Sequence, residues 1–121
     1  MNKKKILVVD DEENIRILFK LGLEEEGYEV DLAGSGQEAL EKIKNTNFDL
    51  ITLDIKMPGM SGLETLQEIR NLNKDKHIPV ILCTAFEEFK QDFTSWASDD
   101  YIVKSHDLTD LKQSIKRLLN K

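Results

Sequence analysis

The sequence has little of what marks secreted or membrane-spanning proteins. It contains one cysteine, Cys83, so an internal disulfide is excluded, which agrees with a reducing compartment. No apolar run approaches the roughly 20 residues that span a bilayer. The apolar residues 6–9, which follow a basic N-terminus, are too few for the core of a signal peptide. These absences indicate a cytoplasmic protein with no membrane insertion.

The sequence also has fewer basic than acidic residues. Lysine and arginine number 17 against 23 acidic residues, and the net charge of −6 argues against direct nucleic-acid binding. With 40% hydrophobic and 33% charged residues, the composition is typical of a folded globular protein. The chain shows no internal repeat, low-complexity segment or linker, and 121 residues suit one domain of ordinary size. We therefore expect a single domain over residues 1–121.

Short strand-like runs alternate with segments of helical periodicity along the whole chain. Lys5–Asp10 contains a continuous apolar run, as expected of a strand buried on both faces. Tyr28–Ala33 instead alternates apolar and polar residues, which indicates an edge strand. The predicted strands are Lys5–Asp10, Tyr28–Ala33, Phe48–Asp54, Ile78–Thr84 and Tyr101–Lys104.

Helices are predicted after each strand from apolar spacing and capping signals. The signals are Asp11 as a cap before about Glu12–Glu26, capping boxes at Ser35–Glu38 and Ser61–Glu64, the aromatic face of Phe86–Trp96, and Asp107 as the last cap. This alternation predicts an α/β fold of flavodoxin-like topology. We expect a doubly wound, five-stranded parallel sheet in the order 2-1-3-4-5, with five helices on its two faces.

Polar residues gather at the carboxyl ends of the predicted strands, which all open on one edge of a parallel sheet. Asp10 and Asp11 end the first strand, Asp54 the third, Thr84 the fourth and Lys104 the fifth. Three neighbouring carboxylates repel one another and raise each other's pKa unless a cation lies among them. Hard carboxylate oxygens suit Mg²⁺, for which Mn²⁺ could substitute, and no cluster of histidine and cysteine indicates zinc.

This set of residues is suited to the in-line transfer of a phosphoryl group to a carboxylate. Asp54 would be the nucleophile and acceptor, while the metal ion and Lys104 neutralise charge on the equatorial oxygens. Lys104 can pair with Asp54 at rest, or with the phosphoryl group once it is present. The Thr84 hydroxyl can donate a hydrogen bond to a phosphoryl oxygen.

Four short motifs lie in order along the chain, each at the end of its own predicted strand. They are Val8-Val9-Asp10-Asp11-Glu12, Asp54-Ile55-Lys56-Met57-Pro58-Gly59-Met60-Ser61-Gly62, Thr84-Ala85 and Asp100-Tyr101-Ile102-Val103-Lys104. Together they resemble the receiver domain of two-component response regulators over essentially the whole chain. The resemblance implies a phosphorylation-activated regulator, in which Asp54 takes a phosphoryl group from a phosphohistidine on a sensor histidine kinase.

The same resemblance implies a set of ligands for the metal ion. Asp11, Asp54 and the backbone carbonyl of Lys56 would bind Mg²⁺, with Asp10 acting largely through water. The Lys56 side chain would lie near the site and influence how long the phosphoryl group survives.

The resemblance also implies a switch formed by Thr84 and Tyr101. The threonine hydroxyl would move toward the phosphoryl group, and the ring of Tyr101 would turn inward behind it; an ordinary half-buried strand tyrosine is the alternative. The protein would then be a signalling switch rather than an enzyme, taking part in its own phosphorylation and autodephosphorylation. With no output domain after the last helix, it would bind a partner or pass the phosphoryl group to a histidine phosphotransfer protein.

Two features depart from the family pattern. Ser105 follows Lys104 where the family usually has proline, often after a cis bond. A cis bond before a non-proline residue costs roughly 3–4 kcal/mol, so we expect a trans bond and a rearranged loop. The segment between Thr84 and Lys104 is also short and lacks the usual glycine, so the helix within it is expected to be atypical.

Other functions share parts of this pattern. A phosphatase with an aspartyl-phosphate intermediate would carry a second acid two residues after the nucleophile, where this chain has Lys56. A flavin-binding protein of the same topology would need a phosphate-binding loop after the first strand, where Asp10-Asp11-Glu12 would repel the phosphate. A receiver cut from a longer regulator is a close variant of the leading interpretation.

Overall fold

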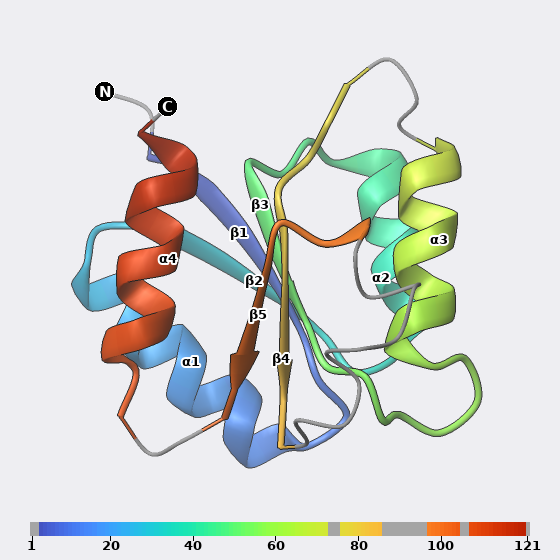
Figure 1. The fold of residues 1–121 in the computed structure, drawn as a ribbon, viewed down its shortest axis with the longest axis horizontal. Helices are drawn as coiled ribbons and strands as arrows, with labels where there is room; N and C mark the ends of the chain where they lie inside the picture. The colour runs from blue at the N-terminus through green and yellow to red at the C-terminus, as the bar shows by residue number, and fades with distance from the viewer. Residues whose placement is uncertain (1–2, 73–75, 86–96, 105–106, 121) are drawn as a thin grey trace.

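A five-stranded parallel sheet forms the centre of the fold (Figure 1). The computed structural model describes residues 3–72, 76–85, 97–104 and 107–120. Its strands are β1 (Lys5–Val9), β2 (Glu29–Ala33), β3 (Leu50–Leu53), β4 (Val80–Thr84) and β5 (Asp100–Val103). All neighbouring strands pair in parallel in the order β2-β1-β3-β4-β5, which confirms the predicted sheet and strand order.

Helices cover both faces of this sheet. In the described part of the chain they are α1 (Glu13–Glu25), α2 (Gly36–Asn45), α3 (Gly62–Leu72) and α4 (Thr109–Leu119). The described residues thus contain four helices and not the predicted five, because the helix expected over Phe86–Trp96 lies outside them and stays a prediction. None of the described helices is long and apolar enough to cross a membrane.

The side chains of β1 show why the sheet needs a helical layer on each side. Ile6 and Val8 belong to a core shared with α1 and α4, whereas Leu7 and Val9 belong to a core shared with α2 and α3. Successive side chains of a strand point to opposite faces, so a strand buried on both sides must be apolar at every position. Figure 1 shows α1 and α4 on one side of the sheet and α2 and α3 on the other.

The beginnings of two helices differ from the sequence prediction. Asp11 is expected to cap α1, but the cap position is Glu12, and no side chain makes a capping hydrogen bond there. Asp107 is expected to cap α4, but the cap position is Leu108. The Asp107 carboxylate does accept a hydrogen bond of 2.9 Å from the amide of Thr109, the first helical residue, so it still satisfies one amide at the start of the helix.

The two predicted capping boxes form to different extents. At α3, Ser61 and Glu64 exchange side-chain-to-amide hydrogen bonds of 3.1 and 3.2 Å, so this box is complete. At α2, the Ser35 hydroxyl accepts from the Glu38 amide at 3.1 Å. Glu38 does not return a bond to Ser35; its carboxylate accepts from the amide of Gly34 at 2.7 Å instead.

Leu7 provides a test of the packing between the sheet and its helices. The side chain is fully buried, so Leu7→Ala is expected to lower the free energy of unfolding by about 2–5 kcal/mol through lost contacts and a residual cavity. Urea unfolding followed by circular dichroism measures the change. Leu21→Ala is the matched control, because Leu21 is 58% exposed and its loss is expected to change stability by about 0.5 kcal/mol or less. Equal losses in the two variants would contradict this packing.

Candidate functional site

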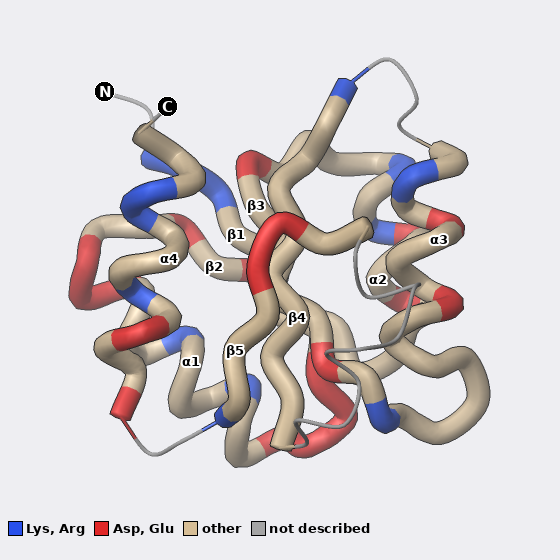
Figure 2. The backbone as a smooth tube through the Cα atoms, viewed as in Figure 1, with Lys and Arg blue, Asp and Glu red and all other residues tan. Residues whose placement is uncertain are grey.

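The carboxyl ends of β1 and β3 lie side by side at one edge of the sheet. Val9, the last residue of β1, is in register with Leu53, the last residue of β3. The Asp54 amide donates to the Val9 carbonyl at 3.0 Å, so the two chains stay paired as they leave the sheet. Asp10 and Asp11 therefore emerge beside Asp54, and Figure 2 shows acidic stretches where these strands end.

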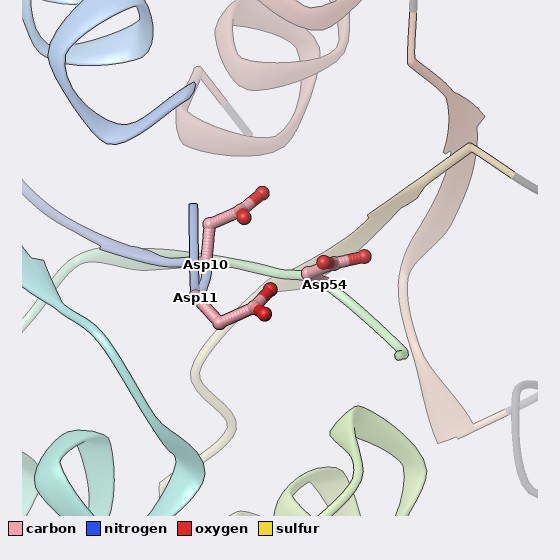
Figure 3. A group of neighbouring side chains, drawn as sticks. All are labelled: Asp10, Asp11 and Asp54. Atoms are coloured by element: carbon pink, nitrogen blue, oxygen red, sulfur yellow. The ribbon is translucent and has the colours of Figure 1, made fainter. Parts of the chain in front are cut away.

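Asp10, Asp11 and Asp54 form a cluster of carboxylates. Each contributes an oxygen that lies within 4.8 Å of the other two (Figure 3). Asp10 and Asp54 are only 2% and 6% exposed, whereas Asp11 is exposed. Two members of the cluster are thus buried, and the third, Asp11, is in contact with solvent.

Lys104 is the positive charge in this cluster. Its Nζ lies 2.5 Å from Asp10 Oδ2 and 3.3 Å from Asp54 Oδ2. The pairing with Asp54 expected from the sequence is present, but the contact with Asp10 is the shorter of the two. Burial alone would lower the pKa of Lys104; the hydrogen bonds and charges of Asp10 and Asp54 outweigh it and raise that pKa. The ammonium group is therefore charged at neutral pH.

The surroundings of Asp54 disfavour its charged form, as its raised pKa shows. Burial raises its pKa from 3.8 to about 6, and the neighbouring Asp10 adds to the increase. The Lys104 ammonium and the Ile55 amide, which donates to Asp54 Oδ1 at 2.9 Å, act in the opposite direction without cancelling it. One lysine therefore compensates only part of the negative charge at this edge.

The donors in the cluster fit a hard divalent cation. They are carboxylate oxygens, and no histidine or cysteine joins them among the residues that the structure describes. Oxygen ligands that leave room for water suit Mg²⁺, and Mn²⁺ accepts the same set. Lys56 follows Asp54 by two positions in the loop before α3, with an exposed side chain. The assignment of its carbonyl as a ligand stays a prediction.

The predicted switch residues belong to the neighbouring strands β4 and β5. Thr84 is the last residue of β4 and is fully buried. Tyr101 is partly buried and packs against the core on the α2 and α3 side. The Lys104 amide donates to the Thr84 carbonyl at 2.7 Å, which ties the end of β4 to the lysine of the cluster. The proposed movements of Thr84 and Tyr101 stay predictions.

The sequence prediction assigned no role in the site to two residues beside the cluster, Gly62 and Arg16. A Cβ at Gly62 would lie 1.9 Å from the carbonyl oxygen of Asp54, so only glycine lets α3 begin this close to Asp54. Arg16 of α1 donates from Nη1 to the Asp10 carbonyl at 2.6 Å. Arg16 could have been noticed in the sequence because it places a positive charge near the start of a helix, where the helix dipole disfavours it. The sequence around Gly62 does not distinguish a glycine that packs against the Asp54 backbone from an ordinary loop glycine.

Comparison with known families identifies the class of protein. Residues 6–116 match the response regulator receiver domain, so the chain belongs to this family, as the motifs predicted. It is similar to the response regulator protein TrrA from Thermotoga maritima, whose crystal structure is a complex with Mg²⁺ and BeF. The two are 53% identical with a TM-score of 0.91, over 96% of this chain and 99% of that one. A receiver domain protein from Methanospirillum hungatei is 36% identical, with a TM-score of 0.90 over 98% of this chain and 95% of its own.

Curated relatives are longer than this chain. The transcriptional regulatory protein ResD of Bacillus subtilis is 42% identical over 123 residues, which cover 99% of this chain and 50% of ResD. The response regulator ArlR of Staphylococcus saprophyticus is 37% identical over 97% of this chain and 53% of its own length. The chain thus spans about half the length of the curated relatives it matches.

The raised pKa of Asp54 predicts a change in stability. An acid with a higher pKa in the folded state than in the unfolded chain destabilises the fold at any pH above both values. Asp54→Asn removes that charge, so without divalent cations at about pH 7.5 we expect a gain of up to about 3 kcal/mol, given the shift from 3.8 to about 6. Urea unfolding in EDTA measures it, and most of the gain should disappear near pH 4, where folded Asp54 is already neutral.

Asp49→Asn is the matched control for this stability measurement. Asp49 directly precedes β3 at the opposite end of the strand, and its carboxylate accepts from the Lys5 amide at 2.7 Å. Its replacement removes the same charge. The asparagine oxygen can still accept from the Lys5 amide, but as a weaker, uncharged acceptor, so no gain in stability is expected. An Asp54→Asn variant that is no more stable than the unaltered protein in EDTA would contradict the uncompensated charge at Asp54.

Proposed function

We propose that this chain is a phosphorylation-activated receiver in which Asp54 accepts a phosphoryl group from a phosphohistidine of a sensor histidine kinase. One observation carries the proposal: the oxygens of Asp10, Asp11 and Asp54 converge within 4.8 Å, with the Lys104 ammonium against two of them. Support comes from TrrA, which has been crystallised with Mg²⁺ and BeF and also in complex with the histidine kinase ThkA.

Asp54 is the nucleophile in this proposal. A bond forms between one of its carboxylate oxygens and phosphorus as the phosphorus–nitrogen bond of the phosphohistidine breaks. Asp11, Asp54 and the Lys56 carbonyl would hold Mg²⁺, with Asp10 acting through water, and the bound ion would supply positive charge to the transferred oxygens. Lys104 keeps its proton throughout and balances charge on the same oxygens.

Thr84 and Tyr101 would report the state of Asp54. The Thr84 hydroxyl would move to donate to a phosphoryl oxygen, and the ring of Tyr101 would turn inward behind it. The hydrogen bond of 2.7 Å from the Lys104 amide to the Thr84 carbonyl supports this coupling, because it joins the backbone of Lys104 directly to the residue that would move. The change would reach the surface formed by β4 and β5.

The proposal extends to the location of the protein, its domain organisation and its output. We place it in the cytoplasm as a single receiver domain over residues 1–121. It would be a signalling switch that takes part in its own phosphorylation and autodephosphorylation. Its output would be the binding of a partner or the onward transfer of the phosphoryl group to a histidine phosphotransfer protein. The near-complete match with the TrrA chain supports a single-domain regulator. The half-length match with ResD leaves a receiver within a longer regulator as the alternative.

Phosphotransfer from a purified, phosphorylated histidine kinase of the source organism tests the proposal. Asp54→Asn is expected to abolish Mg²⁺-dependent labelling, because an amide is not a nucleophile for phosphorus under these conditions. Asp49→Asn, which keeps the cluster intact, is expected to label like the unaltered protein. Undiminished labelling of Asp54→Asn by a kinase that labels the unaltered protein would overturn the assignment of the acceptor.

A further inference from the structure

Arg16 makes a contact with the carboxylate cluster that neither the fold nor the proposed chemistry requires by itself. It lies near the start of α1, is partly buried, and donates from Nη1 to the Asp10 carbonyl at 2.6 Å. None of the ion pairs among the described residues includes it. A positive charge at this end of a helix opposes the helix dipole at a cost of about 0.3–1 kcal/mol. Within the described part of the chain, the hydrogen bond to the Asp10 carbonyl is therefore the interaction that holds the Arg16 side chain in this position.

Asp10 has every polar atom held by a partner. Its amide donates to the Ala33 carbonyl at 3.1 Å, and its Oδ1 accepts from the Glu12 amide at 2.9 Å. Its Oδ2 accepts from Lys104 at 2.5 Å, and its carbonyl oxygen accepts from Arg16. Arg16 is the only one of these partners that fixes the carbonyl, and hence the direction in which the chain leaves Asp10.

The direction of that carbonyl determines where Asp11 lies. The Asp10 carbonyl and the amide nitrogen and Cα of Asp11 share one rigid peptide plane. Asp11 belongs to neither β1 nor α1, so no regular hydrogen-bond pattern orients this plane. Holding the carbonyl of Asp10 therefore sets the path along which the Asp11 side chain projects toward Asp54 (Figure 3).

Gly34, which directly follows β2, provides the space for the guanidinium group. A Cβ at Gly34 would lie 3.3 Å from Nη1 of Arg16, which is tighter than ordinary contact. The absence of a side chain at Gly34 therefore leaves room for Nη1 beside the Asp10 carbonyl.

We infer that Arg16 is a positioning residue for the cation site: by fixing the peptide between Asp10 and Asp11, it directs the Asp11 carboxylate toward Asp54. It would touch neither the cation nor the phosphoryl group. The inference rests on the proposed function, since it concerns Mg²⁺ binding by the cluster. Loss of a positive charge near the cluster would by itself strengthen cation binding. If Mg²⁺ binds more weakly after Arg16 is replaced, the cause is therefore the changed orientation of Asp11 and not the lost charge.

Isothermal titration of the unaltered protein and of Arg16→Met with Mg²⁺ tests the inference. Methionine keeps an unbranched, apolar stem but has no donor, so Mg²⁺ affinity is expected to fall by about ten-fold, as when an outer hydrogen-bond partner of a metal ligand is removed. Arg16→Lys keeps the charge and a donor on a shorter side chain, and a smaller loss is expected. It also serves as the second variant should Arg16→Met fail to fold.

A spectroscopic measurement separates positioning from a general loss of structure. In EDTA, the amide resonance of Asp11 in ¹H–¹⁵N spectra is expected to shift in Arg16→Met, because the peptide plane loses its support. Arg117→Met is the matched control: Arg117 is an exposed arginine of α4 that pairs with Asp100 at the far end of β5, and its loss should change neither the Asp11 resonance nor Mg²⁺ affinity.

Two results would overturn the inference: Mg²⁺ binding by Arg16→Met that is as tight as, or tighter than, that of the unaltered protein, or an Asp11 resonance that does not move. A failure of the unaltered protein to bind Mg²⁺ is a different outcome. It would overturn the proposed function on which the inference rests.

Discussion

Repulsion among three carboxylates at the edge of a buried sheet is the constraint on which the rest of the site depends. Asp10, Asp11 and Asp54 place oxygens within 4.8 Å of one another, and two of the three side chains are almost fully buried. Lys104 offsets part of this charge, yet the pKa of Asp54 still rises to about 6. The negative charge that remains favours the binding of a further cation. A divalent ion that prefers oxygen ligands suits this site.

The fold supplies the rigidity that keeps such an unfavourable cluster together. Two apolar cores, one on each face of the sheet, fix β1 and β3 in register, so the residues that follow them have no freedom to separate. The α3 helix begins against the Asp54 backbone at Gly62, and Arg16 holds the Asp10 carbonyl from α1. The stability of the cores offsets the electrostatic cost, as is common at functional sites.

The sequence predicted the parts of this arrangement that follow from local pattern. Apolar runs ending in Asp10, Asp54, Thr84 and Lys104 indicated a parallel sheet with polar residues at one edge, and the observed strand order agrees. Local pattern did not predict that Asp10 is the closer partner of Lys104, a contact between residues 94 positions apart. Local pattern also assigned Asp11 as the cap of the first helix, whereas the cap position is Glu12. An acidic residue before a helix gives the same sequence pattern whether its side chain points to the helix or to the carboxylate cluster.

The position of the phosphoryl group after transfer tests the central claim most directly. Borohydride reduces an aspartyl phosphate to homoserine, so treatment of the phosphorylated protein followed by peptide mass spectrometry locates the acceptor. We predict homoserine at position 54, formed only when the kinase and Mg²⁺ are both present. Homoserine at another aspartate, or a stable phosphoryl group on a residue other than Asp54, would contradict the role assigned to this cluster.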